Sequence, residues 1–305
     1  MTSPVILAGP TGVGKTAVAI ALAMELDGEV LSVDSMQVYR GLDIGTAKPT
    51  LQERGGIPHH LIDVVDLDQS FDAARFVSEA VPRLEEIASR DRIPILCGGT
   101  GLYFNAWLNG LGSSPAPNPQ LRVELEALPL PELLDELARK DPITFDQIDL
   151  DNRRRVVRAV EVIRLTGKPF SIQRASWPER APALAGRSFG LRRSRQDLHG
   201  RIRRRVEAMF KAGLIEETRQ LLDRGLATNR TAQQAIGYRQ VIEHLEGQRG
   251  RLETIELVQT RTRQFSKRQH TWFENQLDLD WLEVPEDEPP TTTAQRIVRR
   301  LAESR

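Results

Sequence analysis

The chain has 305 residues, with 42 basic and 42 acidic side chains and a formal net charge of zero. Hydrophobic residues make up 40%, enough for a globular core, and no apolar run approaches the roughly 20 residues needed to span a bilayer. The single cysteine, Cys97, excludes an intrachain disulfide and a cysteine-based zinc module. The first residues lack the features of a signal peptide, so we expect a cytoplasmic protein without membrane contact.

The first hundred residues predict alternating strands and helices. Apolar runs predict strands at Pro4–Ala8, Glu29–Val33, His60–Val65 and Ile93–Cys97. Helical spacing predicts helices at Lys15–Leu26 and Phe71–Arg90, the second of them capped by Asp72. This alternation predicts an α/β fold, in which a parallel sheet carries helices on both faces.

The pattern changes after residue 111. Residues 112–119 predict a linker or wide turn, and Lys168–Gly186 predict a loop. Helices are predicted at Gln120–Ala127, Pro131–Lys140 and Asn152–Leu165, in the stretch Gln196–Gln276 with breaks at three glycines, and at Ala294–Glu303; short strands are predicted at Ser188–Arg192 and Asp280–Val284. We therefore predict a P-loop catalytic core formed by residues 1–112 and 187–305, with a helical insertion domain at 113–186.

A glycine-rich segment lies between the first predicted strand and the first predicted helix. It consists of Gly9, Pro10, Thr11, Gly12, Val13, Gly14, Lys15 and Thr16, and it fits the P-loop pattern in the context that a P-loop requires. We predict that these residues bind phosphates, because loop N–H groups and the helix N-terminus point at an anion, Lys15 adds positive charge and Thr16 can ligate Mg²⁺. The alternative is a chance glycine-rich turn. A P-loop alone indicates an ATP-using kinase or NTPase by default.

Two further segments follow the ends of predicted strands, where an open parallel sheet places its ligands. Asp34 begins Asp-Ser-Met-Gln-Val-Tyr, and its carboxylate can hold Mg²⁺ or accept a proton. Thr100 lies in Gly-Gly-Thr-Gly-Leu-Tyr and offers a hydroxyl at the same edge. The alternatives are an aspartate that caps a turn and a threonine that caps a helix.

Basic residues gather in three groups despite the neutral total. The groups are Arg153, Arg154, Arg155, Arg158 and Arg164; Arg187, Arg192, Arg193, Arg195, Arg201, Arg203, Arg204 and Arg205; and Arg261, Arg263, Lys267 and Arg268. Such groups predict either a positive face that attracts phosphate backbones or ordinary solvated helix faces.

Taken together, these segments resemble the tRNA dimethylallyltransferases, of the bacterial type. The resemblance also rests on the strings that begin at Asp43 (DIGTAKP), His59 (HHLID), Asn152 (NRRRVVRAVE), Ile236 (IGYRQ) and Arg263 (RQFSKRQHTW). All run in family order and cover nearly the whole chain. The departures are Val13, where serine is common, and an acidic segment after Trp272, where the family often has an arginine.

The resemblance implies an enzyme that transfers a dimethylallyl group from dimethylallyl diphosphate to N6 of adenine 37 in tRNAs reading codons that begin with U, with Mg²⁺ as cofactor. It implies that the P-loop holds the prenyl donor, that Asp34, Thr100 and Lys15 are catalytic, and that Arg205 meets the diphosphate. We expect a monomer. The implied contacts with the tRNA anticodon stem-loop are Asp34, Ser35, Met36, Gln37, Thr100, Arg122, Arg154, Arg155, Arg158, Gln234, Gly237, Tyr238 and Arg239.

Two other functions stay open at this point. Prenyl transfer to a free adenine nucleotide would use the same loop and aspartate but would not need the arginine-rich helices. A small-molecule kinase would use a mobile arginine lid, which Arg153–Arg158 could provide. The sequence also leaves open whether Asp34 is a base or a metal ligand, and which arginine of 201–205 meets the diphosphate.

Overall fold

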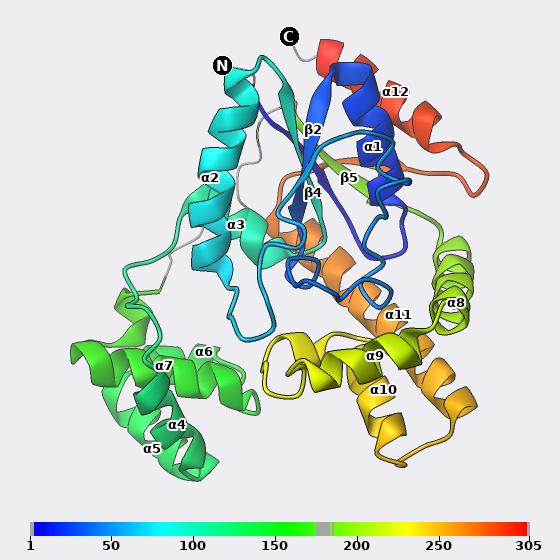
Figure 1. Ribbon diagram of the computed structural model, residues 1–305. Coiled ribbons are helices and arrows are strands. Elements are labelled where there is room, and N and C mark those ends of the chain that lie inside the picture. The colour runs from blue at the N-terminus through cyan, green and yellow to red at the C-terminus, as the bar shows by residue number, and fades with distance from the viewer. Residues whose placement is uncertain (1–2, 175–183, 185, 304–305) are drawn as a thin grey trace. The chain divides into compact units, whose positions relative to one another are not determined.

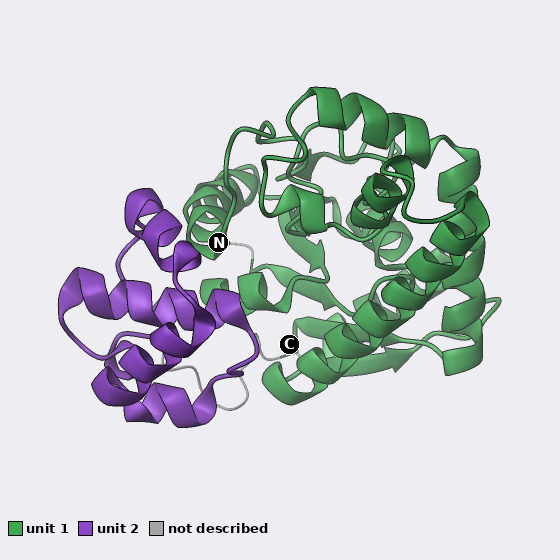
Figure 2. Ribbon diagram, turned by 90° about the horizontal axis from the view of Figure 1, so that it is seen from below, with its two compact units in different colours: residues 1–108, 179–305 green, residues 109–178 purple. Residues whose placement is uncertain are grey.

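The computed structural model describes residues 3–174, 184 and 186–303 (Figure 1). The chain forms two compact units, coloured green and purple in Figure 2. The larger unit contains Met1–Leu108 and Glu179–Arg305, and the smaller contains Asn109–Pro178. The insertion domain that the sequence predicts, 113–186, begins and ends a few residues later than the smaller unit.

The larger unit is built on one six-stranded sheet. Its strands are β1 (Val5–Ala8), β2 (Gly28–Val33), β3 (His59–His60), β4 (Ile93–Gly98), β5 (Ser188–Arg192) and β6 (Asp280–Glu283). They lie in the order β3-β2-β4-β1-β5-β6 and all pair in parallel. The predicted parallel α/β sheet is therefore confirmed.

Alternating strand residues build a hydrophobic core on each face of the sheet, because successive side chains of a strand point to opposite faces. Val5 and Leu7 of β1 pack with helices α1 (Lys15–Leu26) and α12 (Pro290–Glu303). Ile6 and Ala8 pack on the other face, with α2 (Ala73–Ser89), α3 (Gly101–Asn109) and α11 (Arg251–Gln276). Helices therefore cover both faces, as predicted (Figure 1).

The second of these cores extends into the helices that follow β5. They are α8 (Arg195–Lys211), α9 (Leu214–Asp223), the short 3₁₀ helix η2 (Ala232–Gln234) and α10 (Tyr238–Leu245). Gly213 has a φ of 103° and separates α8 from α9, which explains the predicted break at this glycine.

The smaller unit is helical. It contains α4 (Pro119–Ala127), α5 (Leu130–Lys140), α6 (Pro142–Gln147), α7 (Arg153–Thr166) and the 3₁₀ helix η1 (Phe170–Ile172). Leu125, Leu133 and Leu137 pack with the apolar face of α7 in a separate core. The side chains of Asn118, Asp141 and Asn152 cap α4, α6 and α7. Much of the predicted loop 168–186 lies outside the described residues.

The strand predicted at 60–65 is much shorter in the structure, and two short helices were not predicted. Only His59 and His60 pair with β2, because Leu61 and Asp63 have φ values of 58° and 56° and turn the chain out of the extended conformation. The helices that periodicity did not predict are α3 and α6. α6 has only six residues, too few for a clear repeat, and four consecutive residues of α3, Tyr103–Ala106, are buried, so α3 lacks the polar face that a helical repeat requires.

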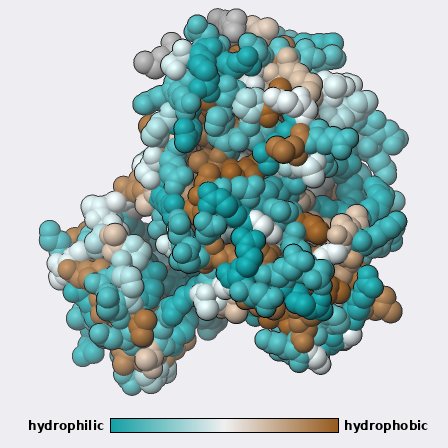
Figure 3. Space-filling view, in the orientation of Figure 1, coloured by the Kyte–Doolittle hydropathy of each residue, from teal (hydrophilic) through white to brown (hydrophobic). Residues whose placement is uncertain are grey.

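Hydrophilic residues cover much of the face shown in Figure 3, with smaller hydrophobic areas between them. Within residues 3–174, 184 and 186–303, no helix is both long and apolar enough to cross a membrane.

Candidate active site

The glycine-rich segment forms the loop between β1 and α1. Gly9, Gly12 and Gly14 have φ values of 147°, 88° and 103°, which side chains other than hydrogen rarely tolerate. A Cβ atom on Gly9 would also lie 2.7 Å from the carbonyl oxygen of Leu191 in the neighbouring strand. The glycines of the motif are therefore required by the loop's backbone, whichever anion it binds.

Arginines of the β5–α8 region hold this loop from one side. Arg193 Nε donates to the Val13 carbonyl at 2.8 Å, and Arg201 Nε donates to the Gly12 carbonyl at 2.9 Å. Arg205 Nη1 donates to Thr11 Oγ1 at 3.1 Å. Of the arginines at 201–205, Arg203 and Arg204 are exposed, whereas Arg205 lines the cavity beside the loop.

The charged side chains that line this cavity are those of Lys15, Arg205, Asp34 and Glu53. Lys15 Nζ donates to the Pro10 carbonyl at 2.8 Å. Burial lowers the pKa of Lys15 to about 8, although the nearby Asp34 carboxylate opposes this shift. Burial also lowers the pKa of Arg205, again against the attraction of Asp34. Both cations are thus desolvated beside the P-loop, where their charges would attract a bound anion.

Asp34 and Thr100 lie at adjacent strand ends and hold one turn between them. Asp34 Oδ1 accepts hydrogen bonds from the backbone N–H groups of Met36 at 2.8 Å and Gln37 at 3.2 Å. Thr100 Oγ1 accepts from the N–H of Ser35 at 3.1 Å. Asp34 therefore caps a turn through its Oδ1 atom, as the alternative interpretation of this residue predicted. The same carboxylate also lines the cavity, so capping and chemistry do not exclude each other.

Two cavities meet at these residues. The first, of about 610 Å³, is lined by the P-loop from Thr11 to Thr16 and by the start of α1. The second, of about 340 Å³, is lined by Ser35, Met36 and Thr100 and by the 234–236 segment. The residues common to both are Thr11, Asp34, Thr46, Arg205, Phe265 and Gln269. Asp34 thus faces both spaces.

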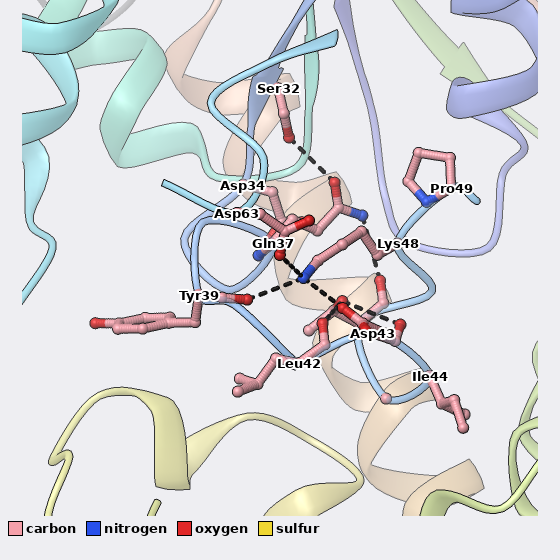
Figure 4. A network of polar contacts seen from close by, with 12 residues as sticks. Ser32, Asp34, Gln37, Tyr39, Leu42, Asp43, Ile44, Lys48, Pro49 and Asp63 are labelled. Carbon is pink, nitrogen blue, oxygen red and sulfur yellow. Dashed lines mark hydrogen bonds and ion pairs between the residues drawn. The ribbon is translucent and has the colours of Figure 1, made fainter. Parts of the chain in front are cut away.

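A buried lysine supports the segment opposite the P-loop (Figure 4). Lys48 Nζ donates to Asp43 Oδ1 at 2.6 Å, to Asp63 Oδ1 at 2.5 Å and to the Tyr39 carbonyl at 2.9 Å. The lysine therefore joins three parts of the sequence, including two of the strings that carried the family resemblance. It fixes the loop that contains Thr46, whose carbonyl accepts from Arg205 Nη2.

Residues of α9 and α10 also bind the loop that contains Thr46. Glu217 accepts from the N–H groups of Ile44 and Gly45, and the Tyr238 hydroxyl donates to Glu217 at 2.6 Å. The Tyr238 side chain is fully buried, and a Cβ on Gly45 would lie 2.4 Å from its ring. The Tyr238 side chain therefore supports this loop, and the prediction that it contacts RNA is corrected.

The other expected RNA contacts of the larger unit differ in exposure. Gln234 and Arg239 are exposed and bonded to each other, with Arg239 Nη1 donating to Gln234 Oε1 at 3.0 Å, and Gly237 is buried between them. The Gln37 amide accepts from Ser32 Oγ and donates to the Thr46 carbonyl. An adenine edge that pairs with the Gln37 amide would have to replace these two hydrogen bonds.

The four arginines of the smaller unit that were expected to contact RNA fall into two pairs. Arg122 and Arg158 both bind Glu161, at 2.6 and 2.7 Å, and the Glu161 side chain is fully buried. These two residues therefore have a structural partner. Arg154 and Arg155 are exposed, and within the described residues neither side chain has an ion pair. Their charges remain available to a phosphate backbone.

Sequence reasoning missed the residues of α11 that contact the site. Gln269 and Ser266 bind the backbone of Thr11, and Trp272 packs against Gly101, where a Cβ would lie 2.1 Å from the indole. Their spacing of three residues places all of them on one face of the helix. That spacing was visible in the string that begins at Arg263, but their partners are about 170 to 260 residues away in sequence.

The residues around the P-loop fit a magnesium ion that arrives with a diphosphate. Thr16 offers a hydroxyl and Asp34 a carboxylate in the same cavity. Within the part of the chain that the structure describes, no group of three or more His, Cys, Asp or Glu side chains could hold a metal alone. Mg²⁺ usually completes its shell with water and substrate phosphates, so this sparse set of ligands is sufficient.

The fold and the site define a parallel α/β protein with a P-loop sequence and an adjacent polar cavity. Residues 37–276 match the family model described as IPP transferase, so the chain belongs to the IPP transferase family. It is 42% identical over 286 residues to "tRNA dimethylallyltransferase 2" of Geotalea uraniireducens, covering 92% of each chain. It is 43% identical to the tRNA dimethylallyltransferase of Halalkalibacterium halodurans, covering 92% of this chain and 90% of the relative.

Solved structures agree with this assignment. The full-length tRNA isopentenylpyrophosphate transferase of Bacillus halodurans matches with a TM-score of 0.72 and 39% identity, over 100% of this chain and 98% of that one. A eukaryotic dimethylallyltransferase, described as acting on tRNA, matches with a TM-score of 0.81 and 29% identity, over 100% of this chain and 80% of that one. The family and the fold expected from the sequence are thus confirmed.

Proposed function

We propose that this chain transfers a dimethylallyl group from dimethylallyl diphosphate to N6 of adenine 37 in tRNAs reading codons that begin with U. The observation that carries this function is the pair of cavities that meet at Asp34. One has the donors needed to hold a diphosphate, and the other is open to a base. A transferase must bring exactly such a donor and acceptor to one point.

The first cavity suits the prenyl donor. Loop N–H groups, Lys15 and Arg205 surround a space in which a diphosphate would gain charge as it leaves. These preorganised positive groups stabilise that charge more than they stabilise the bound donor, which is the condition for catalysis. Thr16 would hold a Mg²⁺ ion bound together with the diphosphate, and that ion would supply further positive charge there.

The second cavity suits an unstacked adenine. The N6 lone pair forms the new bond to the allylic carbon, while the carbon–oxygen bond of the donor breaks and its electron pair leaves with diphosphate. One N6 proton must depart, and Asp34 is the carboxylate that faces both spaces. Asp34 therefore acts as the base, and Thr100 positions the turn beside it through Ser35.

The anticodon stem-loop would meet exposed basic and polar groups, of which Arg154, Arg155, Gln234 and Arg239 are the best placed by their exposure. Proteins read such loops through splayed-out bases and backbone charges. We also propose that the chain acts as a monomer. The tRNA substrate implies a cytoplasmic location.

The test compares two prenyl acceptors and includes a separate reaction with ATP. Purified protein is incubated with Mg²⁺ and dimethylallyl diphosphate together with unmodified tRNA or AMP, and in parallel with ATP and no prenyl donor. Mass spectrometry of digested RNA should find prenylated adenosine with tRNA only. Prenylated AMP without tRNA product, or phosphate release from ATP alone, would contradict the proposal and favour the free-nucleotide or kinase function.

A further inference from the structure

The side chain of Gln269 spans two loops that belong to different parts of the site. Its Oε1 accepts from the N–H of Thr11 at 2.8 Å, and its Nε2 donates to the carbonyl of Gly99 at 2.9 Å. Gln269 is 9% exposed and lines both cavities. A primary amide offers a donor and an acceptor on opposite sides of one rigid plane, so its two bonds hold their partners at a fixed separation.

One partner belongs to the loop of residues 9–16, which we call the donor loop. Thr11 is held on every polar group that it has: Gln269 accepts from its N–H, Ser266 Oγ donates to its carbonyl at 3.2 Å, and Arg205 donates to its hydroxyl. The N–H of Thr11 is therefore directed at α11, and it serves to fasten the loop.

The other partner, Gly99, is connected to residues 34–37, which we call the acceptor loop. Gly99 precedes Thr100, whose hydroxyl accepts from the Ser35 N–H beside Asp34. A Cβ on Gly99 would lie 2.4 Å from Gln269 Nε2, so the amide occupies the space that a larger residue would fill. The bonds thus run without interruption from Thr11 through Gln269 and Gly99 to the turn that carries Asp34.

We propose that Gln269 is a positioning residue that fixes the distance between the donor loop and the acceptor loop. This inference rests on the proposed function, in which the two loops hold the two reactants. Gln269 itself touches the loops and transfers no proton. Its removal should therefore impair alignment of the reactants more than the binding of either one. Small misplacements of this kind cost up to about 100-fold in rate.

The test uses Gln269→Met, which keeps the length of the side chain and removes both bonds. Ser266→Ala is the matched comparison, because Ser266 binds the same Thr11 but does not reach Gly99. Gln264→Met makes the identical change at an exposed position of the same helix. Gly99→Ala disturbs the link from its other end, because the new Cβ would displace the amide of an unsubstituted Gln269. Each variant is checked for folding by circular dichroism before kinetics.

We expect Gln269→Met and Gly99→Ala to lower kcat by about 10- to 100-fold, with KM for dimethylallyl diphosphate and for tRNA within about threefold of the wild type. Gln264→Met should keep kcat within about threefold, and Ser266→Ala, which loses one bond to Thr11 but keeps the link to Gly99, should lower kcat less than Gln269→Met does. An unchanged kcat in Gln269→Met would overturn the inference. So would a decrease in kcat no larger than that of Ser266→Ala, or one fully explained by the fraction of Gln269→Met protein that is unfolded.

A second measurement separates this inference from the proposed function. If the wild-type protein does not prenylate tRNA, the proposed function fails, and amide hydrogen exchange still decides the role of Gln269. The Thr11 amide should exchange faster in Gln269→Met than in the wild type and in Gln264→Met. Unchanged exchange at Thr11 would overturn the link without reference to activity.

Discussion

Replacing Lys48 by methionine tests the network of polar contacts that supports the loop of residues 43–49. The lysine side chain is 4% exposed, and its ammonium binds Asp43, Asp63 and the Tyr39 carbonyl at 2.6, 2.5 and 2.9 Å. Hydrogen bonds to charged groups contribute about 1.5–3 kcal/mol each. The carboxylates are 57% and 40% exposed, however, so water replaces the lysine at both of them.

The expected loss is therefore that of about one strong interaction, roughly 2–3 kcal/mol in the free energy of unfolding, and less than the 3–5 kcal/mol for breaking a fully buried pair. Urea-induced unfolding of the larger unit measures it. Lys211→Met makes the same change at an exposed lysine of α8 that has no ion pair within the described residues, and should cost about 0.5 kcal/mol or less. Equal stabilities of the two variants would refute the role given to Lys48.

Three further predictions concern charge. Because burial lowers the pKa of Lys15 to about 8, the free enzyme loses this cation as the pH rises through about 8; kcat/KM for dimethylallyl diphosphate should fall there, and Lys15→Arg should shift the fall to higher pH. Burial opposes ionisation of Glu161, but hydrogen bonds from Arg158, Arg122 and Asn118 lower its pKa below 4.5; the stability it contributes is present above that value and is lost as the pH falls through the lowered pKa. Glu161→Gln should therefore destabilise the smaller unit by about 1–3 kcal/mol in thermal unfolding at pH 7, a range reduced from that of a fully buried pair because both arginines are partly exposed. Arg154→Ala and Arg155→Ala should weaken tRNA binding and reduce its salt dependence by about one counterion each, without a change in melting temperature, whereas Arg122→Ala should lower that temperature.

The sequence predicted the elements whose patterns are local. Lys15–Leu26 and Ser188–Arg192 have the predicted bounds, because each shows its period within a single element and is bounded by glycine or polar residues. The strand predicted at 60–65 ends at His60, because Leu61 and Asp63 have left-handed φ values, and the apolar residues Leu61, Val64 and Val65 pack in the core without extending β3. Burial produces an apolar run in either conformation, so composition alone could not separate them.

The candidate site was predictable to a similar extent. Asp34, Thr100, Lys15 and the P-loop follow from motifs at strand ends, and the structure brings them around adjoining cavities. The partners of Arg122 and Tyr238 were not predictable, because Glu161 and Glu217 are acidic residues like any others in the sequence. The role of Gln269 was likewise not predictable, because its side chain binds two backbone groups that are distant along the chain.

The most direct test of the central claim is a single-turnover assay of Asp34→Asn with saturating dimethylallyl diphosphate and unmodified tRNA. Asparagine keeps the Oδ1 atom that accepts from Met36 and Gln37, so the turn should persist, but it cannot take the N6 proton. We expect prenylated adenosine at position 37 with the wild type and a rate lower by about 10²- to 10⁴-fold with Asp34→Asn, at unchanged donor affinity. A variant that prenylates tRNA within about threefold of the wild-type rate would contradict the role of Asp34 as the base between the two cavities.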